Sequence, residues 1–232
     1  MLDDLMEEVK LLANREKAEV LQRFFKTGPG QYGEGDVFVG IVVPLSRKIA
    51  KKYASMPDDG ILTLLKSKIH EERLIALLIL IFQFEKGNEQ KKEHIFHIYL
   101  QNTAFINNWD LVDLSAEKIV GAYLNGKPKV VLYGLACSES LWERRISIVS
   151  TFHYIKQGKY DDTLAIADIL LMDREDLIHK AVGWMLREVG KRCSEEAEEI
   201  FLRKHSHEMP RTMLRYAIER FNPEKRRFYL SS

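Results

Sequence analysis

The sequence has little cysteine and almost no excess of either charge. Its only two cysteines, Cys137 and Cys193, lie far apart and form no CxxC pair, so neither a disulfide framework nor a cysteine-rich metal site is indicated. The 35 basic and 34 acidic side chains leave a net charge of +1. Bulk charge therefore does not mark the chain as a nucleic-acid binder, and any basic surface must come from local clustering of Lys and Arg.

Long hydrophobic runs are also missing. The most apolar stretch, residues 74–84, is about half the length of a membrane span and is bounded by charged residues. Met1 leads directly into acidic and polar sequence, unlike a signal peptide. We therefore expect a soluble, cytoplasmic protein without membrane association, folded as a single α-helical repeat domain over residues 1–232.

Alternating patterns typical of β-strands are missing as well, and the one β-branched run, residues 37–43, is short. Apolar residues instead recur with the period of an α-helix. Residues 140–143 resemble a capping box, and Asp173 and Ser194 are candidate N-caps. The predicted helices cover residues 2–26, 44–55, 58–67, 70–86, 88–101, 108–124, 127–137, 140–157, 160–171, 174–192, 195–206 and 210–221.

The predicted helices form pairs joined by short turns, and the pairs recur about every 35 to 40 residues, a period typical of HEAT and armadillo repeats. Residues 72–77 and 143–148 have similar sequences, and each opens the second helix of a pair. We predict an all-α fold: a HEAT/armadillo-like α-solenoid of about six stacked helical hairpins with a concave binding face. A helical bundle is the alternative.

Asp113 is a carboxylate at the edge of an apolar helical stripe. Trp109 lies one turn before it and Ala116 one turn after it on the predicted helix. An aspartate is rarely buried without a partner. Asp113 is therefore either neutralised by a structural arginine or directed into a cleft for use.

Two further predicted helices carry polar groups near an apolar stripe. Arg145 lies within the stripe of residues 140–157, where a structural counter-ion is the alternative to a functional role. Trp184 has Lys180 one turn before it and Arg187 one turn after it. Aromatic rings flanked by cations are typical of surfaces that bind a sugar-phosphate backbone, although a core tryptophan with solvated neighbours has the same spacing.

Other short patterns carry no chemistry in this reading. Residues 28–33 match GxGxxG, but no strand precedes them and Pro29 interrupts them, so a flexible loop is expected. The pairs His94/His97 and His205/His207 lack a third ligand, and no metal or cofactor is expected. The C-terminal residues 226–229 are expected to be a frayed end, with phosphate contact as the alternative.

Four motifs occur together in one order and spacing. They resemble those of the bacterial AlkD-like DNA alkylation repair proteins, which are HEAT-like-repeat DNA glycosylases. The resemblance covers roughly residues 10–220. The motifs are Phe38-Val39-Gly40-Ile41 with the following Pro44, Arg47, Lys48 and Ala50-Lys51; Trp109-Asp110-x-x-Asp113; Leu141-Trp142-x-x-Arg145; and Lys180-Ala181-x-Gly183-Trp184-x-Leu186-Arg187-Glu188.

The resemblance implies a monofunctional glycosylase that releases cationic N3- and N7-alkylpurines from double-stranded DNA without drawing the lesion into a pocket. It implies that Asp113 is the catalytic carboxylate, that Trp109 and Trp184 press against the deoxyribose, and that Arg145 holds the backbone nearby. Tyr32 is implied to pack on the DNA, and Lys180 and Arg187 are expected to bind it as well.

Two other functions remain open at this point. The same concave face could serve a non-catalytic HEAT-type scaffold that binds nucleic acid or a protein partner, since a fold alone does not define a function. A peptide-binding adaptor is a weaker third possibility and predicts an uncharged, hydrophobic groove. Repeat proteins with polar terminal helices are commonly monomers, so a monomer is expected.

Overall fold

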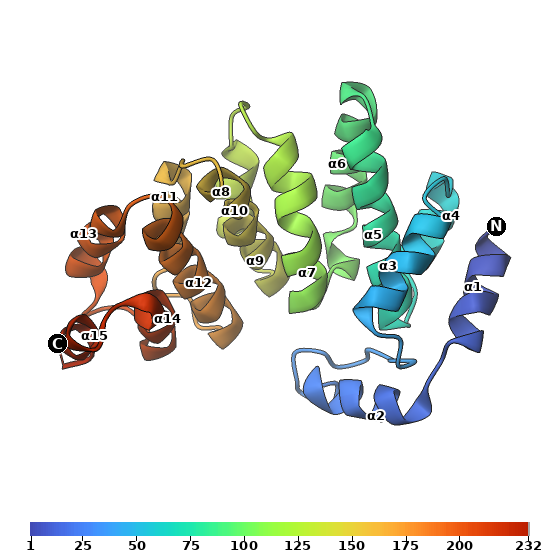
Figure 1. The fold of residues 1–232 in the computed structure, drawn as a ribbon, viewed down its shortest axis with the longest axis horizontal. Helices are drawn as coiled ribbons and strands as arrows, with labels where there is room; N and C mark the ends of the chain where they lie inside the picture. The colour runs from blue at the N-terminus through green and yellow to red at the C-terminus, as the bar shows by residue number, and fades with distance from the viewer. Residues whose placement is uncertain (232) are drawn as a thin grey trace. The chain divides into compact units, whose positions relative to one another are not determined.

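The computed structural model describes residues 1–231, in which helices and turns account for the fold and no β-strand is present. The prediction of an all-α fold is confirmed. The chain forms two compact units, residues 1–111 and a second unit that begins at Val112, and the boundary falls inside helix α7 (Trp109–Ala116). A single repeat domain stays a prediction. Figure 1 follows the helices in chain order.

The first unit is organised around α5 (His70–Lys86), which packs against α3, α4 and α6. Every residue from 70 to 81 is buried, so this helix forms the core on all its sides. From Leu74 to Ile81 the helix is apolar around its whole circumference, as the run at residues 74–84 predicts. The other helices of this unit are α1 (Leu2–Leu11), α2 (Arg15–Phe24), α3 (Val43–Lys52), α4 (Asp58–Leu65) and α6 (Glu89–Gln101), with a 3₁₀ turn at Thr103–Phe105.

One predicted helix of this unit is wrong: residues 2–26 form two helices, α1 and α2, instead of one. Asn14 separates them, because its side chain accepts a hydrogen bond from the backbone N–H of Lys17 and caps α2. The backbone of Asn14 also bonds to the Val39 carbonyl. Gly40 lies against it with φ of 87°, and a Cβ at Gly40 would lie 2.1 Å from the Asn14 carbonyl oxygen.

The second unit is organised around α12 (Asp176–Arg192), which packs against α9, α11, α13 and α14. Pairs of consecutive helices are in close contact here, among them α8 with α9, α11 with α12, and α12 with α13. The arrangement as HEAT-like hairpins stays a prediction. The helices of this unit besides α12 are α8 (Val130–Ala136), α9 (Leu141–Ser150), α10 (Phe152–Ile155), α11 (Asp161–Ile169), α13 (Glu195–His205), α14 (Arg211–Ala217) and α15 (Pro223–Ser231), with a 3₁₀ turn at Ile218–Arg220.

The predicted helix 108–124 changes its winding just after Asp113. Residues Glu117–Gly121 form a π-helical turn, a feature that often accompanies functional sites. This turn packs against α9 and α10. Gly121 permits the approach, since a Cβ there would lie 2.2 Å from the carbonyl oxygen of Ser150.

The structure differs from the prediction at two helix starts and at the C-terminal end. Ser140 makes no capping hydrogen bond, and Glu143 accepts from Ser138 instead, so the capping box is wrong. Asp173 is not the N-cap of α12, which begins three residues later; its carboxylate is held by Arg144. Ser194 does cap α13. The C-terminal residues form α15 rather than a frayed end, and Tyr229 is buried.

Candidate functional site

Asp113 and Arg145 form a two-point ion pair in the second unit. Nε of Arg145 lies 2.9 Å from Oδ1 of Asp113, and Nη2 lies 2.8 Å from Oδ2. Such a pair fixes both the position and the plane of the carboxylate. The Arg145 side chain is only 6% exposed, whereas that of Asp113 is 21% exposed. A buried arginine therefore orients a carboxylate that remains partly accessible to solvent.

Arg145 also ties this carboxylate to α12. Its Nη1 donates to the carbonyl oxygen of Leu177 in the first turn of that helix. One buried guanidinium thus joins α7, α9 and α12. Arg145 is thus a counter-ion, one of the two roles considered for it, and its partner is Asp113.

Trp184 lies further along α12 and is half-buried. Its ring packs against Phe152 with the centroids 5.7 Å apart. The Phe152 ring is in turn approached by Lys156, whose Nζ lies 4.5 Å from the centroid, and by Arg192 at 5.3 Å. On the other side, Gly183 lets α14 approach closely, because a Cβ there would lie 2.4 Å from the Met213 carbonyl oxygen. The Trp184 ring therefore packs against Phe152 of α10 without being fully enclosed.

The two cations predicted to flank Trp184 both have acidic neighbours. Lys180 forms an ion pair of 2.6 Å with Asp176, one turn earlier on α12, and both side chains are substantially exposed. Arg187 is paired with Glu219 and lies 3.6 Å from Glu188. A DNA phosphate would compete with these carboxylates for the same cations. Their predicted role in DNA binding stays a prediction.

Trp109 lies in an aromatic cluster of the first unit. Its ring stacks on Phe25 with centroids 5.1 Å apart and an interplanar angle of 20°, and the exposed Phe24 contacts it edge-on. The indole Nε1–H donates to the hydroxyl of Tyr32 at 3.1 Å. The structure thus brings together two residues, Trp109 and Tyr32, that the sequence assigned separately. The loop of residues 28–36 carries Tyr32 and, through it, contacts Trp109.

A buried polar network underlies the same region and was not identified from the sequence. His70 lies between Asp36 and Asp110, with Nδ1 3.0 Å from Asp36 and Nε2 2.8 Å from Asp110. Asp36 also accepts from Arg73 at 2.5 Å and from Asn108 at 3.1 Å. The only sequence signal is the run of four charged-type side chains, residues 70–73, at the start of an otherwise apolar helix.

The pKa values in this network follow from its hydrogen bonds. Burial alone would raise the pKa of the Asp36 carboxyl, but the hydrogen bond from His70 and the charge of Arg73 outweigh it and hold this pKa below its usual value. Burial alone would lower the pKa of His70, but its bonds to Asp110 and Asp36 outweigh it and raise this pKa. The network therefore favours an ionised Asp36 and a protonated His70 imidazole.

The Phe38-Val39-Gly40-Ile41 motif has a structural explanation. The buried carboxylate of Glu71 accepts hydrogen bonds from the backbone N–H groups of Val39, Gly40 and Ile41 at 2.8 to 3.2 Å. This satisfies three backbone donors with one charged acceptor. The motif therefore holds the loop that carries Tyr32 and Asp36 against α5.

Residues 1–231 lack two other kinds of feature. No group of three or more His, Cys, Asp or Glu side chains in this range is arranged to hold a metal ion. None of the helices in the same range combines the length and the apolar character that crossing a membrane requires.

Comparisons with protein families and with solved structures each give a match. The family described as "DNA alkylation repair enzyme" matches residues 5–221, nearly the whole chain. A solved structure of a predicted DNA alkylation repair enzyme from Enterococcus faecalis is similar to this one, with a TM-score of 0.68 at 17% sequence identity. The similarity covers 91% of this chain and 97% of that one, and it shows a shared fold. No curated protein matches the chain.

Proposed function

This chain belongs to the DNA alkylation repair enzyme family, and on that premise we propose that it is a DNA glycosylase. Its substrates are purines alkylated at N3 or N7 in double-stranded DNA. It hydrolyses the N-glycosidic bond, releases the free base and leaves an abasic site. The lesion is not drawn into a pocket, in contrast to the usual base-flipping mode.

The observation that carries this proposal is the pairing of Asp113 with Arg145. The arginine is buried and the carboxylate remains 21% exposed, so the pair orients a charge that a ligand can still reach. An adjacent guanidinium favours the ionised form of a carboxylate against the desolvation that opposes it. Asp113 is thus a pre-oriented negative charge within reach of a large ligand that binds at the surface.

The proposed chemistry needs such a charge. Alkylation at N7 or N3 makes the purine cationic, and breaking the bond to C1′ lets the base leave with the bonding electron pair as a neutral molecule. The sugar is left as an oxocarbenium-like cation. The Asp113 carboxylate stabilises that cation and orients a water molecule, whose oxygen bonds to C1′ and whose proton passes to the carboxylate or solvent.

The two tryptophans are assigned to the sugar. Trp184 is half-buried and supported by Phe152, and Trp109 is half-buried and lies four residues before Asp113 on α7. An indole face against the developing cation contributes about 1–2 kcal/mol of cation–π stabilisation when the contact is dry. We assign Lys180, Arg187 and Tyr32 to the DNA backbone, where they position the duplex without reading its sequence.

A direct assay tests this function. The protein is incubated with genomic DNA treated with a methylating agent, and the free bases are separated and identified by mass spectrometry. The expected result is release of 7-methylguanine or 3-methyladenine by the protein, and release at least about 10-fold slower by Asp113→Asn. DNA binding without base release would instead support a non-catalytic HEAT-type scaffold.

A further inference from the structure

His70 is clamped between two carboxylates by both of its ring nitrogens. Nδ1 faces Asp36 and Nε2 faces Asp110, and the His70 side chain is only 2% exposed. An ionised carboxylate can only accept hydrogen bonds, so both ring nitrogens must carry a proton for both contacts to be favourable. The geometry is therefore that of an imidazolium bridge between the loop before α3 and the first turn of α7.

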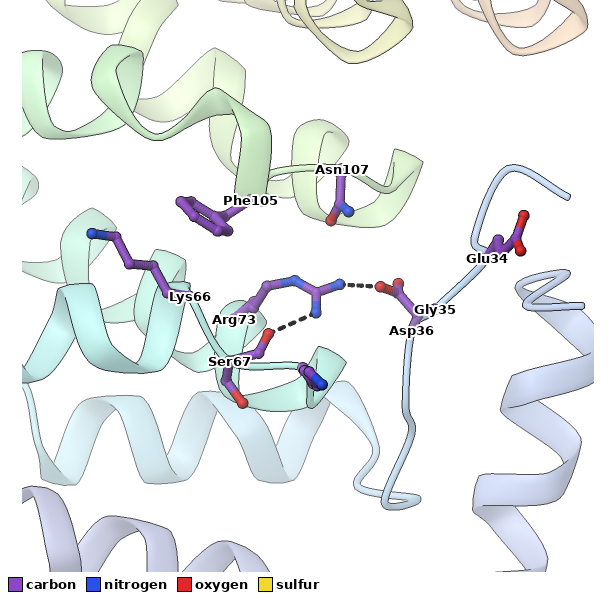
Figure 2. Close-up of a pocket in the computed structure, with 9 residues that line it drawn as sticks. Glu34, Gly35, Asp36, Lys66, Ser67, Arg73, Phe105 and Asn107 are labelled. Carbon is purple, nitrogen blue, oxygen red and sulfur yellow. Dashed lines mark hydrogen bonds and ion pairs between the residues drawn. The ribbon is translucent and has the colours of Figure 1, made fainter. Parts of the chain in front are cut away.

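The remaining groups around His70 fit a single positive charge at this position. Arg73, one turn along α5, bonds to the other oxygen of Asp36 and to the carbonyl oxygen of Ser67, as Figure 2 shows. The Phe38 ring stacks on the imidazole with centroids 4.4 Å apart, and the Phe25 ring packs beside it at a tilt, with centroids 5.2 Å apart. The negative charges of the two carboxylates are thus balanced by the positive charges of one guanidinium and one imidazolium.

Trp109 is connected to this cluster along the chain and through its ring. Asp110 follows it directly, and Asn108 before it donates to Asp36 and accepts the backbone N–H of Trp109. The Phe25 ring that packs on His70 also stacks on Trp109. Three consecutive residues at the start of α7 are therefore held by contacts that depend on His70 or on its partner Asp36.

We propose that His70 is a positioning residue, which as an imidazolium bridge between Asp36 and Asp110 sets the orientation of Trp109 at the start of α7. The effect on catalysis rests on the proposed function, whereas the positioning of Trp109 does not depend on it. Neutralising the bridge releases the Asp110 side chain and places an unpaired charge in the protein interior. The first turn of α7 then shifts, and the Trp109 ring with it.

The positioning is tested by NMR on the full chain, which contains three tryptophans and gives three indole N–H resonances. Trp109→Phe identifies the resonance of Trp109. His70→Gln should move that resonance and leave the other two in place. In the wild-type protein, raising the pH through the titration midpoint of His70 should move the same resonance, which tests the bridge even if His70→Gln does not fold.

The catalytic consequence is tested by base release. His70→Gln should slow release at saturating protein by on the order of 10-fold, because small displacements of positioning groups have effects of that size. The Kd for duplex DNA should change by less than about 2-fold, since His70 itself is buried away from the ligand. If His70 had a purely structural role, His70→Gln would lower the melting temperature, and it would not slow base release while leaving the Kd for DNA unchanged.

The matched control is His205→Gln. His205 is also buried, pairs with Asp168 at 3.1 Å and packs on Phe201, but it lies in the other unit. This control should leave the Trp109 resonance and the release rate unchanged. The inference is overturned if His70→Gln leaves the Trp109 resonance in place, or if it affects base release no more than His205→Gln. If the wild-type protein releases no base, the proposed function fails, while the Trp109 resonance still decides whether His70 positions that ring.

Discussion

Both oxygens of Asp113 are held by the guanidinium of Arg145, and the same guanidinium binds the backbone of α12 through the Leu177 carbonyl. The orientation of the carboxylate is therefore determined by two helices that are distant from α7 in the sequence. Because Arg145 is buried and Asp113 is half-buried, removing either partner affects both stability and the charge presented to a ligand.

Asp113→Asn should reduce the rate of base release by at least about 10-fold, the usual size of a general-base or electrostatic contribution. Affinity for duplex DNA should fall little or rise, because one negative charge facing the phosphates is removed. Single-turnover release of 7-methylguanine and fluorescence anisotropy separate the two quantities. Equal losses of release and of binding would contradict the role of Asp113.

Arg145→Lys should lower both stability and base release, since a lysine ammonium cannot make two parallel hydrogen bonds to one carboxylate. The loss of stability should be about 1–3 kcal/mol by chemical denaturation. Arg144→Lys is the matched control, because Arg144 makes a similar two-point contact with Asp173 in the same unit. The control should lose stability and keep its release rate; a similar loss of release in both variants would argue against a functional pair.

Lys180→Ala and Asp176→Asn should change DNA binding in opposite directions. The two side chains form an exposed ion pair on α12. Removing Lys180 deletes a phosphate contact, whereas neutralising Asp176 removes a carboxylate that competes with the phosphate for this lysine. Lys180→Ala should flatten the dependence of log K on log salt by about one unit of slope. Salt titrations of both variants and the wild type measure this slope. Equal slopes in all three proteins would show that Lys180 does not contact the DNA phosphates.

Trp184→Ala should chiefly slow base excision, in contrast to Lys180→Ala. The half-buried indole packs against Phe152 and is assigned to the sugar, not to the phosphates. Its removal should leave the salt dependence of binding unchanged while the excision rate falls by on the order of 10-fold. If the two variants have interchangeable effects on rate and on salt dependence, the assigned roles are wrong.

Glu198 should make the protein less stable as the pH rises through the neutral range. Burial, assisted by the neighbouring Glu195 and Glu199, raises the pKa of this carboxyl to about 8. Between its ordinary value of 4.5 and about 8, the folded state holds a proton that the unfolded state has lost, so the free energy of unfolding falls as pH rises.

Glu198→Gln removes this dependence of stability on pH. Its free energy of unfolding, relative to that of the wild type, should rise by on the order of 3 kcal/mol between pH 5 and pH 9. Urea denaturation at both pH values measures the difference. The exposed Glu196→Gln on the same helix is the control, and it should track the wild type at both pH values. The same response in both variants would show that Glu198 is ionised in the folded protein at neutral pH.

Much of the local structure could be predicted from the sequence, and the errors have identifiable causes. The uninterrupted apolar run of α5 and the cap at Ser194 were predicted correctly because both depend on neighbouring residues. The break between α1 and α2 depends on Asn14, a local signal that was available but outweighed by helical periodicity. Tail residues such as Tyr229 bury against the fold, which no local pattern near the C-terminus indicates.

The sequence by itself determined the all-α class, the helix period and the isolated acid at position 113, since these depend on spacing along one helix. It also supplied Arg145 as a polar group in an apolar stripe. Only the tertiary structure decided that these two side chains meet, that Tyr32 reaches the Trp109 indole, and that His70 lies between Asp36 and Asp110. Each of those contacts joins residues about 30 to 80 positions apart, and their geometry is set by packing between helices that no local pattern encodes.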